Sequence, residues 1–304
     1  MNYRKGLCIV FLVVFQAAFG QSSTDSFLKP SDTLIKIRQN TVIISESILV
    51  SGTLLGLNQL WYANYPRSNF HFINDNAEWL QMDKAGHLFS TYQMGRAGSE
   101  MMKWSGSSKQ NQLIYGAGLG LAFMTSVEVL DGFSSQWGFS IGDMAANVSG
   151  TTLYVSQELI WNEQRITPKF SFHSTQYAAM RPEILGHSII EQILKDYNGQ
   201  TYWLSTNLYS FSKGSKIPKW LNIAIGYGAE GMISGNNGNN TSLLTPKPER
   251  FRQFYLSFDA DLTKISTKNH LLKTIFSIFN SVKIPAPTIE YSAHRGLQFH
   301  TLYF

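Results

Sequence analysis

The hydrophobic pattern of this chain changes its period near Pro168, and that change constrains the fold more than any other feature. Before it, apolar segments of about twenty residues recur, a length that suits helices. After it, apolar and polar residues alternate with a period of two, as in half-buried antiparallel strands. The pattern predicts an α+β protein, with a helical domain over residues 41–163 and an antiparallel β domain over residues 170–304.

The first half is predicted to form an N-terminal bundle of about four apolar helices. The predicted helices span residues 41–62, 83–103, 111–130 and 140–158. In the first, Gly52 and Gly56 are four positions apart, a spacing that lets another helix approach closely. This helix is either membrane-embedded or part of a buried core, and Glu46 and Asn58 weaken the membrane alternative.

The second half is predicted to form strands over residues 202–211, 221–230, 254–262 and 289–304. Strands of about ten residues, apolar on one face and small or polar on the other, are also used by outer-membrane barrels. About five or six such segments are present, fewer than the eight of the smallest barrels. A barrel-like region and an ordinary sheet packed on the helices therefore both remain open. An amphipathic helix over residues 271–282 lies in a membrane interface or packs on the sheet.

The N-terminus carries the features of an export signal. Arg4 and Lys5 precede the apolar run 7–15, and the small residues Ala18 and Gly20 suit a signal peptidase. Residues 1–20 are therefore predicted to be a signal peptide, and residues 21–40 a flexible lead-in. The only cysteine, Cys8, lies within the signal, which excludes disulfides and thiol chemistry from the mature chain and argues against a lipid-modified N-terminus.

The composition favours a surface that partly meets lipid. Charged residues make up 15% of the chain and aromatic residues 13%, against about 25% charged in an average soluble protein. Without Arg4 and Lys5 the chain has 23 basic and 20 acidic residues, and it has no basic cluster of the kind that follows a nucleic-acid backbone. The predicted partners are membrane lipid or an envelope protein, with no nucleic acid. The predicted location is the periplasm-facing cell envelope, at the outer rather than the inner membrane.

Ionisable and amide side chains gather at two points of the helical half, amid apolar sequence. They are Asp83, Lys84 and His87, and then Glu128, Asp131, Asp143 and Asn147. Residues four positions apart share a helix face, so Asp83 lies over His87 and Asp143 over Asn147. Asp83, and Ser140 with Asp143, are also placed to cap or complement helix N-termini. We expect the two groups to form one polar cluster in an apolar interior.

The motifs D-K-x-x-H at residues 83–87 and E-x-x-D-G-F at 128–133, followed by W-G-F-S-x-x-D-x-x-x-N-x-x-G at 137–150, resemble the YfiM-like family. That family is a group of unknown function described as predicted periplasmic lipoproteins. More distantly, the motifs resemble the VanZ-like membrane proteins linked to glycopeptide tolerance. The resemblance implies an architecture and a polar site but no reaction. This chain departs from the lipoprotein description because no cysteine stands at a suitable position.

Three kinds of chemistry suit the cluster. As a structural network, Lys84 or Arg96 pairs with Glu128 or Asp131, and Asn147 bonds across helices. As a binding site, the cluster holds a lipid or cell-wall headgroup.

As a reactive site, the cluster offers two possibilities. His87, Asp83, Glu128 and Asp143 offer ligands for a divalent cation, or His87 acts as acid and base with Asp83 or Glu128. Neither a G-x-S-x-G elbow nor a phosphate loop is present. The leading hypothesis is a non-enzymatic, membrane-associated envelope factor that is structural or binds a headgroup, with no cofactor assigned. The alternative is a metal-dependent or His-assisted hydrolase or transferase acting on envelope lipid or glycan.

Overall fold

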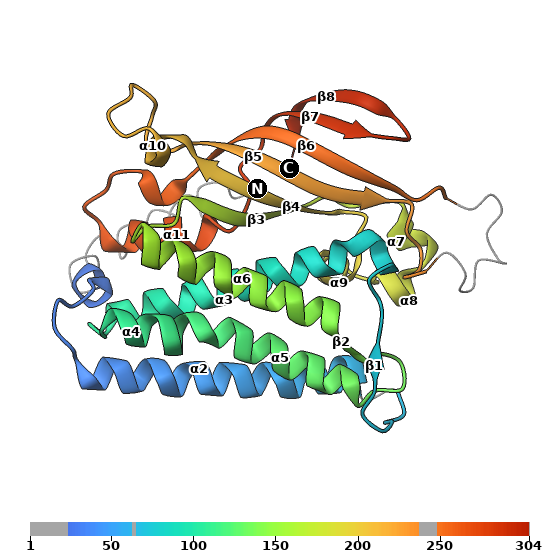
Figure 1. Ribbon diagram of the computed structural model, residues 1–304, viewed down its shortest axis with the longest axis horizontal. Coiled ribbons are helices and arrows are strands. Elements are labelled where there is room, and N and C mark those ends of the chain that lie inside the picture. Colours follow the sequence, from blue (N-terminus) through green and yellow to red (C-terminus); the bar gives the residue numbers. More distant parts are fainter. Residues whose placement is uncertain (1–23, 63–64, 237–247, 304) are drawn as a thin grey trace, which may run out of the picture.

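Four long helices lie beside an antiparallel sheet in the computed structural model, which describes residues 24–62, 65–236 and 248–303 (Figure 1). The helices are α2 (Lys36–Leu57), α3 (Met82–Trp104), α5 (Gly118–Gly132) and α6 (Ile141–Ile160). The turn α4 (Lys109–Asn111) and the π-helical η3 (Gln112–Ala117) lead directly into α5, and the π-helical η1 (Asn58–Tyr62) continues α2. The four predicted helical segments are thus helical, and the predicted signal peptide lies outside the described residues.

The bundle is less uniformly apolar than predicted. Helices α2 and α5 fit the prediction, whereas α3 buries Thr91, Arg96 and Ser99 along with its apolar residues. Ser140 caps α6 as predicted, because its Oγ accepts a hydrogen bond from the Asp143 backbone N–H at 3.1 Å. Asp83 stands in the first turn of α3, where it complements the helix dipole, but its side chain caps no backbone N–H.

Close contact between helices occurs at different glycines from those predicted. A Cβ at Gly98 would stand 2.6 Å from the carbonyl oxygen of Gly116, and one at Gly95 2.6 Å from that of Ala117. Helix α3 and η3 therefore meet backbone to backbone. The predicted close approach at Gly52 and Gly56 is wrong, since nothing lies within 4 Å of a Cβ at either position.

The sheet is open and strictly antiparallel. Its strands are β3 (Ile166–Phe172), β4 (Gln200–Asn207), β5 (Leu221–Glu230), β6 (Phe251–Ala260), β7 (Ala286–Ser292) and β8 (Gly296–Tyr303). They pair in sequence order, and β3 and β8 form the two edges among the described residues. The barrel-like alternative is therefore wrong for the described chain. The predicted strand 289–304 is a hairpin of β7 and β8, with Gly296 at φ 69° in its turn.

The remaining elements are short. They are β1 (Phe72–Ile73), η2 (Glu78–Gln81), β2 (Phe139–Ser140), α7 (Tyr177–Met180), α8 (Pro182–Leu185), α9 (Ile189–Lys195), α10 (Leu208–Phe211), η4 (Leu262–Lys264) and α11 (His270–Phe279). Strands β1 and β2 form a separate parallel pair beside the start of α6. Helix α11 corresponds to the predicted amphipathic helix and has no buried residue.

The sheet buries polar side chains and exposes apolar ones. One row across β4 to β8 consists of Leu204, Ile225, Leu256, Ile289 and Phe299, which are between 42% and 67% exposed. The neighbouring row, on the opposite face, contains the buried residues Trp203, Tyr255 and Glu290. On that buried face Lys169 Nζ lies 2.8 Å from Asp259 Oδ2. A sheet whose outer face meets water has the opposite arrangement, with apolar side chains buried and polar side chains exposed.

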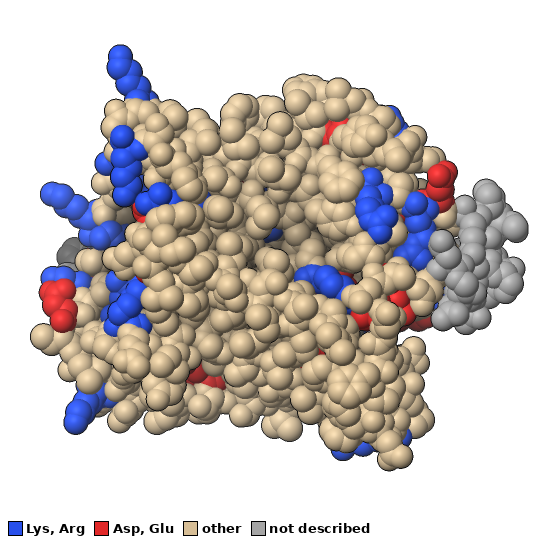
Figure 2. Space-filling view, in the orientation of Figure 1, with Lys and Arg blue, Asp and Glu red and all other residues tan. Residues whose placement is uncertain are grey.

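Charges are scarce on the surface as well. In the view of Figure 2, lysine, arginine, aspartate and glutamate gather toward the two ends of the long axis, and the middle is almost free of them. In the described part of the chain, helical stretches 36–57 and 109–132 are long and apolar enough to cross a membrane. That finding rests on length and composition alone, which helices inside a soluble bundle also satisfy.

Candidate functional site

An unusual backbone turn sets the start of α3, where three of the predicted site residues lie. Trp79, Leu80 and Gln81 have φ of 47°, 51° and 65°, in the left-handed region that non-glycine residues rarely adopt. The sheet holds this turn, because the Tyr227 hydroxyl donates to the Leu80 carbonyl and Arg252 Nη2 donates to Gln81 Oε1 at 2.7 Å. The first two turns of α3, which follow directly, carry Asp83, Lys84 and His87.

The paired strands β1 and β2 bring a further carboxylate to the site. The β1 strand leads into Asp75, and β2 ends at Ser140, the residue that caps α6. Ser140 Oγ donates to Asp75 Oδ1 at 2.6 Å, and both side chains are buried. The loop before α3 is thereby fixed to the start of α6.

Lys84 is the cation of the site. Its Nζ lies 2.7 Å from Asp75 Oδ2, 3.0 Å from Asp83 Oδ2 and 2.9 Å from Asp143 Oδ1. The contact with Asp143 is an ion pair only, since Asp143 Oδ1 has no hydrogen bond of good geometry. The predicted structural network therefore exists with different partners, because Lys84 pairs with these aspartates instead of Glu128 or Asp131.

His87, Glu128 and Asn147 form the inner part of the site. His87 Nδ1 lies 3.1 Å from Asn147 Oδ1 and 3.7 Å from Glu128 Oε1. Thr91 Oγ1 donates to the same Asn147 oxygen at 3.0 Å, and the Ser140 backbone N–H donates to Glu128 Oε2 at 3.1 Å. Glu128 is 1% exposed and Asn147 fully buried. Asn147 thus bonds across helices, from α6 to α3, as the sequence predicts.

Asp131 and Arg96 have their partners outside the group of His87, Glu128 and Asn147. Asp131 Oδ1 accepts a hydrogen bond from the Tyr62 hydroxyl at 2.6 Å, which ties the end of η1 to α5. Arg96 does not reach the cluster: its Nη1 lies 3.2 Å from Glu100 Oε1 and donates to Ser277 Oγ at 2.7 Å. The predicted pairing of Arg96 with Glu128 or Asp131 is wrong.

The buried carboxyls of the site differ in how readily they ionise. Burial, with the charge of Asp143 second, raises the pKa of Glu128 to about 8. Burial, with the charge of Asp83 second, raises the pKa of Asp143 to about 6. Burial acts against Asp75 too, but hydrogen bonds from Lys84 and Ser140 hold its pKa below the ordinary value. Positive charge is therefore sufficient near Asp75 and deficient near Glu128.

Two sets of side chains among the described residues place metal-ligand atoms within 4.8 Å of one another. One set is His87, Glu128 and Asp143, and the other is Asp75, Asp83 and Asp143. Lys84 Nζ already lies within 3.0 Å of all three carboxylates of the second set. The first set combines a nitrogen ligand with two carboxylates.

A cavity of about 370 Å³ opens beside His87 and Asp83. Its walls are apolar and come from α3, α5, β3, α9 and β4. They include Phe89, Met124, Phe170, Ile193, Leu194 and Tyr202. The lining thus combines a few polar side chains, Asp83, His87, Ser90 and Gln200, with mostly apolar and aromatic ones, a combination that suits an amphiphilic ligand.

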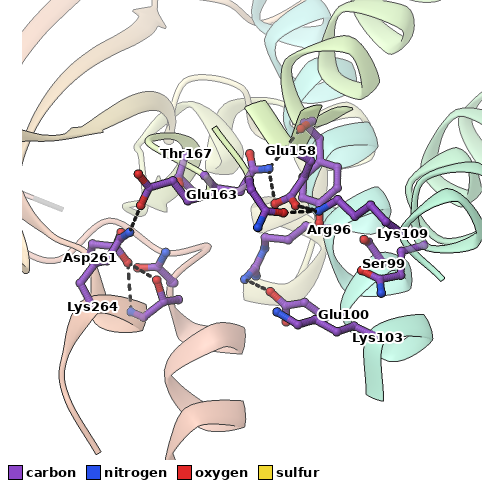
Figure 3. Close-up of a pocket in the computed structure, with 16 residues that line it drawn as sticks. Arg96, Ser99, Glu100, Lys103, Lys109, Glu158, Glu163, Thr167, Asp261 and Lys264 are labelled. Atoms are coloured by element: carbon purple, nitrogen blue, oxygen red, sulfur yellow. Dashed lines mark hydrogen bonds and ion pairs between the residues drawn. The ribbon is translucent and has the colours of Figure 1, made fainter. Parts of the chain in front are cut away.

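A second pocket, of about 450 Å³, lies near the far ends of α3 and α6 (Figure 3). Most of its charged side chains pair with one another. Lys109 pairs with Glu158, and Lys264 Nζ lies 2.9 Å from Glu163 Oε2. Because these charges are already neutralised, we place the candidate site at the first cavity.

Two residues of the site escaped sequence reasoning. Asp75 stands in a loop without periodicity, where the polar run Asn74-Asp75-Asn76 is the sole local sign. Tyr62 ends an apolar segment and reads as a helix boundary. Nothing in either position indicates a partner far along the chain.

Comparison with known proteins gives one match. No curated protein and no solved structure matches the chain. The resemblance to the YfiM-like and VanZ-like families stays a prediction. Residues 71–157, which carry the left-handed turn, α3, α5 and most of α6, match the family model "Predicted periplasmic lipoprotein (DUF2279)", a description consistent with an exported, envelope-associated protein.

Proposed function

We propose that this protein is a membrane-associated envelope factor that binds the headgroup of an amphiphile at the His87 cavity. The observation that carries the proposal is the lining of that cavity, in which His87 and Asp83 stand among mostly apolar and aromatic side chains. A lipid would place its polar group near the imidazole and its chain along the walls. Its apolar part would then leave water, which is worth about 25 cal/mol per Å².

Helix α9 supports this assignment. Ile193 and Leu194 line the cavity, and Leu194 is 58% exposed at the same time. Ile189 and Ile190 on the same short helix are 53% and 70% exposed. A ligand arriving from a membrane would meet these side chains first, because they connect the apolar surface to the apolar interior.

The exposed apolar row of the sheet and helix α11 support membrane association. Exposed apolar patches of this extent mark interaction sites in soluble proteins, and the scarcity of charge beside them favours lipid as the partner. On α11, Ile278 and Phe279 are 60% and 57% exposed. An amphipathic helix of this kind suits a membrane interface.

The proposal is tested by identifying and quantifying the lipid that copurifies with the protein. The full chain would be purified from membranes in mild detergent, and bound lipid extracted and identified by mass spectrometry. Ser90→Trp fills the cavity and should reduce bound lipid several-fold. Ser149→Trp makes the same change on the exposed face of α6 and should leave bound lipid unchanged.

Met124→Trp fills the cavity from a different helix, α5, and guards against a folding defect in one variant. Equal lipid content in the wild type and both cavity variants, with circular dichroism unchanged, would refute the proposal. So would the absence of any stoichiometric lipid from the wild type.

A second candidate function is hydrolysis or group transfer on the same ligand. The observation that favours it is the presence of His87 in the wall of the cavity, because a histidine side chain is the most common general acid or base in enzymes. Prolonged incubation with the extracted lipid separates the two functions. Intact lipid supports binding alone, and a product that His87→Gln fails to form supports catalysis.

A further inference from the structure

The inner end of the site is short of positive charge. Glu128 and Asp143 are 1% and 4% exposed, and each has one carboxylate oxygen, Oε1 and Oδ1, without a hydrogen bond. A buried polar atom left without a partner costs about 1–3 kcal/mol, and more when it is charged. Asp143 Oδ1 has Lys84 Nζ at 2.9 Å, but Glu128 Oε1 has no partner within hydrogen-bond distance and calls for an explanation.

Lys84 supplies positive charge to Asp143 but not to Glu128. Its ammonium lies 2.9 Å from Asp143 Oδ1 and also pairs with Asp75 and Asp83, so one cation is shared by three carboxylates. No contact joins Lys84 to Glu128 among the ion pairs of the described residues. The nearest basic group to Glu128 Oε1 is the His87 imidazole, whose Nδ1 lies 3.7 Å away, beyond hydrogen-bond distance.

We propose that His87, Glu128 and Asp143 hold a divalent first-row transition cation. Their ligand atoms lie within 4.8 Å of one another, close enough for one ion to contact all three after a small adjustment. The proposal does not depend on headgroup binding, since the ligand set lies in the helix bundle and only His87 also lines the cavity.

The donor set points to the class of ion. One imidazole nitrogen with two carboxylate oxygens suits Zn²⁺ or Mn²⁺ better than Ca²⁺ or Mg²⁺, which prefer oxygen ligands throughout. One outer contact would orient a ligand, because the Ser140 N–H donates to Glu128 Oε2 at 3.1 Å. Such outer contacts are a regular feature of metal sites.

The test is the metal content of the full chain. Protein purified in detergent would be stripped with EDTA, dialysed against Zn²⁺ or Mn²⁺, passed through a desalting column and analysed by mass spectrometry of the metal. We expect about one ion per chain in the wild type. Glu128→Gln and Asp143→Asn should each lower the affinity at least tenfold.

Asp75→Asn is the matched control. It removes the same charge from the same cluster, but on the Lys84 side and outside the ligand set, so it should retain the ion. If the wild type binds no ion, or if Glu128→Gln binds it as well as Asp75→Asn does, the proposal is overturned. Should Asp143→Asn fail to fold through loss of its contact with Lys84, Glu128→Gln decides the matter, since Glu128 has no such contact.

Discussion

Lys84 Nζ on α3 lies 2.9 Å from Asp143 Oδ1 on α6, and this buried ion pair joins the two helices with the most extensive mutual contact in the described part of the chain. The pair stands at the point where the Asp75 loop, the start of α3 and the start of α6 meet. Removing one partner of a buried pair leaves an uncompensated charge, which is far more costly than losing an exposed pair. The stability of the bundle is therefore sensitive at this position.

Lys84→Met is expected to lower the free energy of unfolding by about 3–5 kcal/mol, because Asp75, Asp83 and Asp143 lose their common cation. Urea denaturation in EDTA, followed by circular dichroism, measures the change. Lys103→Met alters an exposed lysine on the same helix and should change it by less than about 0.5 kcal/mol. Equal effects of the two substitutions would contradict the buried network. Adding Asp143→Asn to Lys84→Met should restore part of the loss.

Gly98→Ala should destabilise the protein by about 1–3 kcal/mol, since the new methyl group would stand 2.6 Å from the Gly116 carbonyl oxygen. Gly52→Ala provides the comparison, because nothing lies within 4 Å of its Cβ. It should raise stability by up to about 1 kcal/mol through helix propensity. Thermal melts of both variants check the prediction, and a neutral Gly98→Ala would mean that α3 and η3 are further apart.

Lys283, which lies in the β half, makes the free energy of unfolding depend on pH. Its side chain is fully buried, and burial lowers its pKa from 10.5 to about 8. Between these two values the unfolded chain binds a proton that the folded chain does not, so the free energy of unfolding rises with pH. The rise attributable to this residue is about 3 kcal/mol in all.

Lys283→Met should abolish that rise and be more stable than the wild type near neutral pH. Denaturation at about pH 7.5 and about pH 10 measures both effects. The exposed Lys268→Met should keep the wild-type dependence. A rise of the same size in Lys283→Met would assign it to other groups.

Leu256→Asp should lower the membrane-bound fraction of the protein several-fold, because a charge on a lipid-facing strand is unfavourable by a few kcal/mol. Leu256 is 49% exposed in the centre of the apolar row, so the folded core should be unaffected. Met180→Asp changes a residue of similar exposure, 41%, on α7 and should leave the fraction unchanged. Flotation of the full chain with phospholipid vesicles is the measurement. An unchanged bound fraction for Leu256→Asp would remove the sheet from the membrane-facing surface.

The sequence by itself determined the long helices and most of the strands, and which of their faces carry polar groups, but not β3 or the short helices α7 to α10. The cap at Ser140, the stripe of Asp143 and Asn147, and the alternation along β5 and β6 follow from local backbone geometry, which is readable within one segment. Periodicity is a property of a single helix or strand, so it can be read from the sequence without knowing which elements pack beside it.

Only the tertiary structure decided which groups meet. The pairing of Lys84 with Asp75, the hydrogen bond between Tyr62 and Asp131, the open edges of the sheet and the empty surroundings of Gly52 and Gly56 all depend on residues distant in sequence. An ion pair forms with whichever opposite charge the fold brings within about 4 Å. The spacing of residues along the chain therefore does not identify the partner. The strands of an open sheet and of a barrel share one alternation, and the difference lies in whether the first and last strands meet.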